Sequence, residues 1–238
     1  AVAKLDSLED GPKGALAAEA AHQYLRLGRI EDAVALASSG SGLERAQILA
    51  SAALAGGPTY RPQGLIPTTV STVALARGGY VAEAEASWLK LRRLWSSNSD
   101  LEILLGVLEG EIASAEGKSN LAIQLLTENL SSYKALPFTY GFGTYFLGSQ
   151  SLGRALANRG DLNEAVEVLE EVLDPDLNSR YLEGAWINLN TRLLLAQIYQ
   201  ELGHIDRQEE LVEELEHLLQ YADEDHPILE AIRKMKES

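Results

Sequence analysis

The residues of this chain that could do chemistry are few and scattered. The sequence has four histidines and no cysteine, which excludes thiol catalysis, disulfide bonds and cysteine-ligated zinc. His217 has a carboxylate at helical spacing, four residues back at Glu213, which makes a single pair of possible metal ligands. Two such ligands on a glutamate-rich helix face do not complete a metal site, which needs three or four converging groups. We therefore expect no metal ion.

Sequence patterns typical of enzymes are absent or incomplete. The chain contains no HExxH, GxxxxGK[ST] or GxSxG. The segment "GFGTYFLG", residues 141–148, has two glycines of a GxGxxG loop but Phe146 at the third position, and it follows no predicted strand. Paired carboxylates such as Glu170 and Glu171 fall on a polar helix face, without the burial that raises a pKa. We expect no catalytic residue and no cofactor, so the chain is predicted not to be an enzyme.

Composition narrows the class of partner. The 238 residues are 46% apolar and 23% charged, as in a globular protein, with a net charge of −15. That charge repels nucleic acid and anionic membrane surfaces, and no apolar run is long enough to insert in a bilayer. Residues 201–238 hold twelve acidic against four basic side chains. This acidic end is interpreted as a solvated helix face or as a docking surface for a basic partner.

The elements that would position any site are helical hairpins. Each hairpin is marked by a glycine at which the first helix ends, because a short turn between antiparallel helices needs a residue that tolerates positive φ. Five such hinge glycines occur: Gly28, Gly79, Gly117, Gly160 and Gly203.

Small residues recur at fixed offsets from these hinges. Five residues after each hinge the sequence has Ala33, Ala84, Ala122, Ala165 and, as the exception, Gln208. Seven residues before each hinge it has Ala21, Thr72, Gly110, Gly153 and Ala196. Small side chains at both places let the two helices of a hairpin approach closely. The matched offsets therefore indicate one repeated unit.

Outside the hairpins, a further helix is predicted over residues 43–55 and a closing helix over Pro227–Lys236. Two irregular stretches, "GGPTYRPQG" at 56–64 and "ALPFTYGFG" at 135–143, contain the glycines and prolines that interrupt helices, and the second is followed by a helix starting near Thr144. No segment predicts a convincing strand.

Four residues before the hinge the sequence has a larger side chain in four of the five units: Tyr24, Leu75, Leu156 and Tyr199, with Ala113 as the exception. The order of small residue, Tyr or Leu, hinge Gly and Ala resembles the tetratricopeptide repeat (TPR), a helix-turn-helix unit that stacks into a right-handed superhelix. Residues 65–238 are also similar to the C-terminal repeat region of bacterial eukaryotic-type serine/threonine kinases. The segments that carry this likeness are "LARGGYVAEAEASWLKL", "LGRALANRGDLNEAVEVLEEVLD" and the closing "ADEDHPIL". The kinase resemblance implies a sensory or scaffolding region apart from the catalytic part.

The expected fold is all-α: antiparallel helix-turn-helix repeats stacked into a right-handed TPR-like superhelix, an α-solenoid. One solenoid is expected over residues 1–238. Residues 1–64 would form a less regular hairpin with an extra helix, and residues 65–238 four TPR-like hairpins with a closing helix.

In such a stack the first helices of the hairpins line a concave groove that can bind an extended peptide or a helix. The outward positions of three of these helices define the predicted partner-binding groove: Val107, Glu111, Ser114, Gln150, Arg154, Asn158, Asn190, Gln197 and Glu201. The Lys and Asn pair with which some repeats hold a C-terminal carboxylate is not expected, because Lys is absent from these positions. An ordinary solvated helix face is the competing interpretation.

The predicted function is a non-catalytic protein–protein interaction module, the regulatory or sensory region of a larger bacterial signalling protein, binding a protein or peptide in its groove. One alternative is a self-assembling adaptor that forms homodimers through its end repeats. Another is a small-molecule sensor with a pocket near 56–64 and 137–143. The compartment stays open: the bacterial cytoplasm, or the extracytoplasmic side if a membrane span precedes Ala1.

Overall fold

The computed structural model describes residues 10–37, 42–56, 68–95, 99–133, 142–173 and 184–237, and within them it contains twelve α-helices, one short 3-10 helix and no strand. The all-α prediction is confirmed. The helices are α2 (Asp10–Arg26), α3 (Ile30–Ala37), α4 (Gly42–Leu54), α5 (Thr69–Arg77), α6 (Val81–Trp95), α7 (Ser99–Ala115), α8 (Ser119–Tyr133), α9 (Phe142–Arg159), α10 (Leu162–Glu170), η1 (Glu171–Leu173), α12 (Gly184–Leu202), α13 (Ile205–Leu218) and α14 (Pro227–Glu237).

Ten of these helices form five hairpins, and the predicted hinges are confirmed. The backbone of every hinge glycine has positive φ, from 71° at Gly28 to 94° at Gly160. Each hinge joins two helices that pack on each other, so the pairs are α2 with α3, α5 with α6, α7 with α8, α9 with α10, and α12 with α13. The turn is closed in the same way each time. At Gly160, for example, the amide of Asp161 donates to the carbonyl of Leu156.

The small residues sit where the helices of a hairpin touch. The four alanines five residues after a hinge are completely buried, and Gln208 at the fifth place is also buried. At Gly153 a side chain would not fit, because a Cβ there would lie 2.4 Å from Cγ of Leu169 on α10. The repeated spacing thus sets how closely α9 and α10 pack, and with them the shape of the stack.

The helices predicted outside the hairpins also form. α4 packs against α2, α3 and α5, and so bridges the first and second hairpins. α14 begins at Pro227, as predicted, and its buried residues Ile228 and Ile232 face the rest of the molecule. α9 begins at Phe142, slightly before the predicted start near Thr144, which places Gly143 inside the helix.

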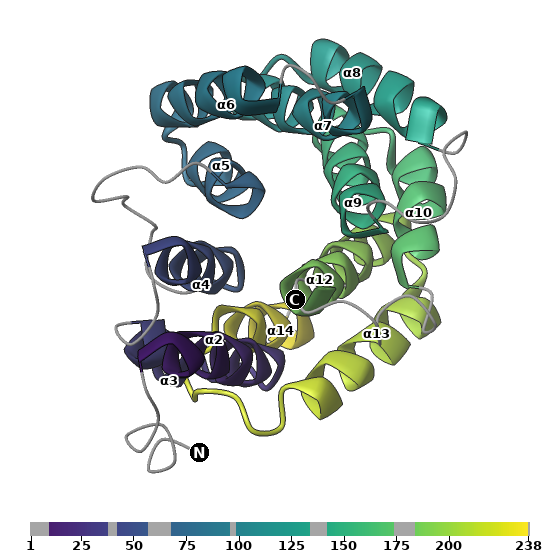
Figure 1. Ribbon diagram of the computed structural model, residues 1–238. Helices are drawn as coiled ribbons and strands as arrows, with labels where there is room; N and C mark the ends of the chain where they lie inside the picture. Colours follow the sequence, from purple (N-terminus) through teal and green to yellow (C-terminus); the bar gives the residue numbers. More distant parts are fainter. Residues whose placement is uncertain are drawn as a thin grey trace.

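The hairpins follow a curve, with α5, α7, α9 and α12 on its inner side and α6, α8, α10 and α13 on its outer side (Figure 1). We call α5, α7, α9 and α12 the inner helices. The curve bends far enough to bring α12 into contact with both α2 and α14. The first hairpin therefore lies against the last part of the chain.

This end contact has specific partners. Asp223, in the turn before α14, accepts hydrogen bonds at Oδ2 from the amides of Ile30 (2.8 Å) and Glu31 (3.3 Å), which begin α3. Its own amide donates to the carbonyl of the hinge Gly28 (3.2 Å). A carboxylate at a helix N-terminus satisfies free backbone amides and complements the helix dipole. The last turn of the chain thus caps a helix of the first hairpin.

Within the described ranges, no helix has the length and apolar content to cross a bilayer, and no group of three His, Asp or Glu residues could hold a metal ion. The irregular stretches named for the small-molecule pocket fall largely outside these ranges, at 57–64 and 137–141. One solenoid over the whole of 1–238 stays a prediction.

Candidate functional site on the inner face

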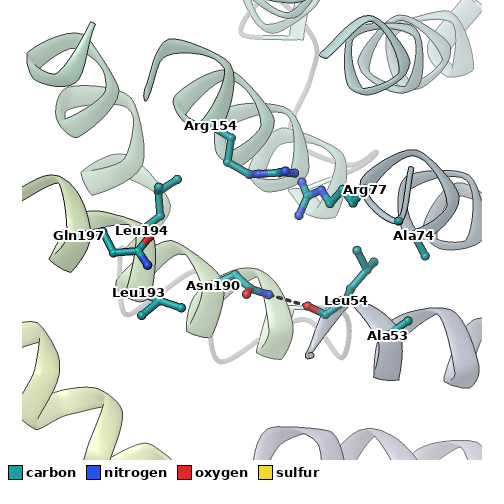
Figure 2. Close-up of a pocket in the computed structure, with 10 residues that line it drawn as sticks. Ala53, Leu54, Ala74, Arg77, Arg154, Asn190, Leu193, Leu194 and Gln197 are labelled. Atoms are coloured by element: carbon teal, nitrogen blue, oxygen red, sulfur yellow. Dashed lines mark hydrogen bonds between the residues drawn. The ribbon is translucent and has the colours of Figure 1, made fainter. Parts of the chain in front are cut away.

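A cavity of about 350 Å³ opens on the inner side of the curve. It lies between α4, α5, α9 and α12 (Figure 2), so its walls come from four helices that are far apart in the sequence. The lining residues are Ala53, Leu54, Ala74, Arg77, Gly78, Arg154, Asn190, Leu193, Leu194 and Gln197. One part of the wall is apolar, and the other carries two arginines and two amides.

Asn190, one of the lining residues, joins two of the helices that form the cavity. Its side-chain nitrogen donates to the carbonyl of Leu54 at the end of α4 (Figure 2) and to the carbonyl of Trp186 in its own helix, both at 2.8 Å. The first of these hydrogen bonds joins residues 136 positions apart. It also supplies a partner to one of the last carbonyls of α4, which have none within the helix. Asn190 is therefore a structural link between α4 and α12.

Behind the cavity lies a buried ionic cluster centred on Glu111 of α7, which we call the Glu111 cluster. Arg77 donates from Nε to both carboxylate oxygens of Glu111 (3.2 Å each) and from Nη2 to Oε1 (2.5 Å). Ser151 of α9 also donates to this carboxylate. The carboxylate is only 4% exposed, so each of these contacts is made away from bulk water. The cluster ties together the inner helices α5, α7 and α9.

The two arginines of the cavity differ in how they are held. Arg77 also donates from Nη1 to Gln150 (3.0 Å), and its guanidinium lies over the ring of Trp186 at 5.4 Å from the centroid. Among the residues that the structure describes, Arg154 makes one ion pair, Nη1 to Glu111 Oε2 at 3.6 Å, and its side chain is one third exposed. Arg77 is thus fixed by its neighbours, whereas Arg154 keeps most of its donors for the cavity.

The electrostatics of the cluster follow from its charges. Burial alone raises the pKa of Glu111, but the charges of Arg77 and Arg154 and the hydrogen bonds from Arg77 and Ser151 outweigh it and lower that pKa to about 2. The charge of Arg77, followed by burial, lowers the pKa of Arg154 to about 10, against the opposing effect of Glu111. Both arginines and Glu111 are charged at neutral pH, which leaves one positive charge in excess.

The structure distributes the nine predicted groove residues over three environments. Arg154, Asn190 and Gln197 come together at the cavity. Val107, Glu111 and Gln150 are buried in the packing between inner helices and present no surface. Ser114 is partly exposed, and Asn158 and Glu201 are exposed near the hinge ends of α9 and α12, outside the cavity lining.

Sequence reasoning missed Arg77 and the apolar wall. Arg77 lies two residues before the hinge Gly79, the place that Asn158 and Glu201 occupy before their own hinges. The position two residues before the hinge, which was used to select Asn158 and Glu201, would therefore also have selected Arg77. The part played by Leu54 carried no such signal, because α4 belongs to no hairpin and its position depends on the curvature of the whole array.

Comparison with known proteins gives one family match, "Tetratricopeptide repeat", over residues 150–176. This segment spans the second half of α9, the hinge Gly160, α10 and η1, and it includes Arg154. No curated protein sequence matches the chain significantly.

Two crystal structures of similar shape are of TPR-like repeats from Podosopora anserina, in a protein assigned as a kinesin light chain. One is of a single-residue variant, with 22% identity and a TM-score of 0.43 over 89% of this chain and 96% of that one. The other has 22% identity and a TM-score of 0.42 over 86% and 93%.

Residues 150–176 therefore match the tetratricopeptide repeat, and they lie within an all-α array of paired helices. Repeats of this kind are typically non-catalytic and bind other proteins.

Proposed function

We propose that this chain is a non-catalytic protein-interaction module that holds a segment of a partner protein against its inner helices. The observation that carries the proposal is the cavity, whose walls are supplied by α4, α5, α9 and α12 and whose lining includes Arg154 and Gln197. The TPR match of the segment containing Arg154 supports it. A concave surface shared by several repeats presents many side chains to one extended ligand.

A selection of peptides from a random display library tests the proposal. Gln197 is exposed at the cavity, so Gln197→Trp fills its mouth while leaving the core of α12 intact. Selected peptides should bind wild-type protein and lose at least about tenfold in affinity on Gln197→Trp, since a bulky side chain occupies their place.

The matched control is Glu213→Trp, which adds the same indole to the exposed side of α13. It should leave the affinity of the selected peptides unchanged. If both tryptophan variants bind them as wild type does, the inner face is not where the partner sits.

A second candidate function, small-molecule sensing, is favoured by the volume of the cavity. About 350 Å³ lies within the usual range of small-molecule sites, roughly 300–1,000 Å³. A thermal-shift screen of metabolites would reveal such a ligand as an increase in melting temperature that Gln197→Trp abolishes. Stabilisation by a metabolite together with failure to select any peptide would favour this candidate.

The wider context that we propose is the regulatory or sensory region of a larger signalling protein. Its support is the sequence resemblance of residues 65–238 to the C-terminal repeat region of bacterial eukaryotic-type serine/threonine kinases. Reading the coding sequence around this chain tests it: a kinase domain in the same frame is expected, and a frame without any signalling domain would contradict it.

Self-association through the end repeats stays a prediction. In the structure the first hairpin and the residues before α14 contact each other within one chain, which uses part of both end surfaces. Sedimentation over a range of protein concentrations would reveal a dimer as an increase in apparent mass.

A further inference from the structure

The cavity carries one positive charge more than its walls neutralise, although the whole chain has a net charge of −15. Arg77 and Arg154 face a single carboxylate, Glu111, in the described part of the chain. A positive cavity in an acidic protein indicates a binding site, because an ordinary solvated helix face of this protein is on average acidic. The cavity therefore attracts anionic groups, which the acidic surface elsewhere on the protein repels.

Arg154 is the group that can use this charge. A guanidinium has five N–H donors in a fixed fork, and the one polar contact of Arg154 within the described residues is an ion pair longer than a hydrogen bond. Figure 2 shows its guanidinium between α9 and α5, next to that of Arg77. The charge of Arg77 and burial hold the pKa of Arg154 below its usual value, a sign of crowded positive charge that an anion would relieve.

We propose that the cavity binds the carboxylate of an acidic side chain, Asp or Glu, presented by the partner segment, with Arg154 as its anchor. This inference rests on the proposed function and names the chemistry of the partner at that same site. Arg77 acts through Glu111 as a positioning residue, because it holds the carboxylate that keeps Arg154 directed to the cavity.

The charge count selects a carboxylate over a phosphate group. One carboxylate neutralises the single excess charge of the cavity, and its two oxygens match the fork of a guanidinium. A phosphate group, with nearly two negative charges at neutral pH, would leave the site negative with Glu111 beside it. The negative charge of the buried Glu111 therefore disfavours a phosphate group relative to a carboxylate.

The remaining wall favours a side chain over the end of a peptide chain. Leu54, Leu193 and Leu194 offer apolar surface on which the methylene stem of an acidic side chain can pack. A chain terminus would also bring backbone amide groups that need partners in the cavity. The amide hydrogens of Asn190 are already used by Leu54 and Trp186, so among the lining amide side chains only Gln197 has amide hydrogens left to donate to the backbone carbonyl groups of such a terminus.

Peptide arrays test the inference. The probes are N-acetylated, C-amidated random nonapeptides, which carry no terminal charge, and the proteins are wild type, Arg154→Gln and Arg154→Lys. We expect Asp or Glu to be enriched at one position of the peptides that bind wild type. Replacing that residue by Gln or Asn in the peptide should lower the affinity by about tenfold or more, the size of a charge-assisted hydrogen bond.

The variants separate a binding role from a structural one. With Arg154→Gln, replacing the acidic residue of the peptide should not change its affinity, because the positive charge that binds that residue has been removed. Arg154→Lys should keep part of the preference, since it retains the charge and loses the fork. Arg154→Gln leaves the Arg77–Glu111 pair balanced, so the protein should remain folded, which circular dichroism checks.

The other outcomes are distinct. Peptides that bind with no acidic preference would overturn the inference and leave the proposed function in place. Array sets with a free C-terminus or with phosphoserine that bind more tightly than the acidic set would overturn the choice of an acidic side chain. If no peptide binds, the proposed function fails and this inference with it. Arg154-dependent binding of free glutarate would then assign the cavity to a small molecule.

Discussion

The Glu111 cluster and the end contact both join helices that are far apart in the sequence, but they do so by different physics. In the cluster, full charges are buried: Glu111 is 4% and Arg77 12% exposed. In the end contact, the carboxylate of Asp223 is only partly buried, and it works with tight apolar packing at Gly28. The comparison teaches that the stability of the middle of the array depends on the balance of buried charges, whereas the stability of the end contact depends on close packing.

Glu111→Gln should have the largest effect, because it removes the charge that the two arginines share. Breaking one side of a buried ion pair costs about 3–5 kcal/mol of unfolding free energy, since the partners remain as uncompensated buried charges. Urea denaturation measures the loss. The exposed Glu109 lies on the same helix, and Glu109→Gln should change the unfolding free energy by less than about 0.5 kcal/mol. Equal effects of the two substitutions would mean that water screens the cluster.

Replacing two hinge glycines by alanine, one at a time, should show how much of the stability loss at the end contact comes from lost packing and how much from backbone strain. Gly28 and Gly203 have nearly the same φ, 71° and 75°, so alanine costs each about 1–2 kcal/mol of strain. A Cβ at Gly28 would also lie 2.5 Å from Cβ of Ala222 and 2.7 Å from Cδ2 of Leu219, whereas one at Gly203 meets nothing within 4 Å.

Gly28→Ala should therefore be less stable than Gly203→Ala by roughly 1–3 kcal/mol, the usual cost of overpacking. Thermal and urea unfolding of the two variants measure the difference. If both alanines lower stability equally, the ends of the chain do not touch in solution as they do in the structure.

Mild acid should destabilise the end contact but not the Glu111 cluster. Of the predicted changes in unfolding free energy, this one is the smallest. Burial lowers the pKa of His226 from 6.5, although Asp223 and Asp225 oppose the shift. Its Nδ1 accepts from the amide of Ile228, and within the described residues its buried Nε2 has no partner. Because the unfolded chain takes up the proton at a higher pH than the folded one, the free energy of unfolding falls as pH drops below about 6.5.

The pKa of Glu111 is instead about 2 when folded and 4.5 in its ordinary state, so its contribution is lost only below about pH 4.5. Urea unfolding at pH 7.5 and pH 5.5 should show a loss in wild type that is smaller in His226→Gln. The remainder is expected from His22, whose pKa burial also lowers. In Glu111→Gln the loss over this pH range should equal that of wild type. A loss unaffected by His226→Gln would exclude this residue as its source.

The hairpins were predictable from sequence because their requirements are local. A turn with positive φ needs glycine, and close helices need small residues at fixed distances from it. The hinge at Gly160 and the contact of Gly153 with Leu169 thus follow from a few neighbouring positions. The same logic placed Arg154 and Gln197 on the inner face of consecutive inner helices, where the structure has them.

Curvature was not predictable, because it is the sum of small rotations between successive hairpins. The register puts Glu111 at the same position as Arg154 and Gln197, six residues before a hinge, yet Glu111 is buried and they line the cavity. What buries it is the approach of Arg77 from one neighbouring helix and Ser151 from another. The contact of Asp223 with the start of α3 has the same origin.

The end contact constrains the number of hairpins that can lie between α3 and Asp223. An open array can gain or lose a hairpin at little cost, because each unit touches only its neighbours. Here one added hairpin would carry Asp223 away from the amides of Ile30 and Glu31, and Asn190 away from Leu54. Copy number is therefore constrained in this chain as it is in a closed ring. Duplication of a hairpin, the ordinary way in which such arrays grow, would have to rebuild both contacts at once.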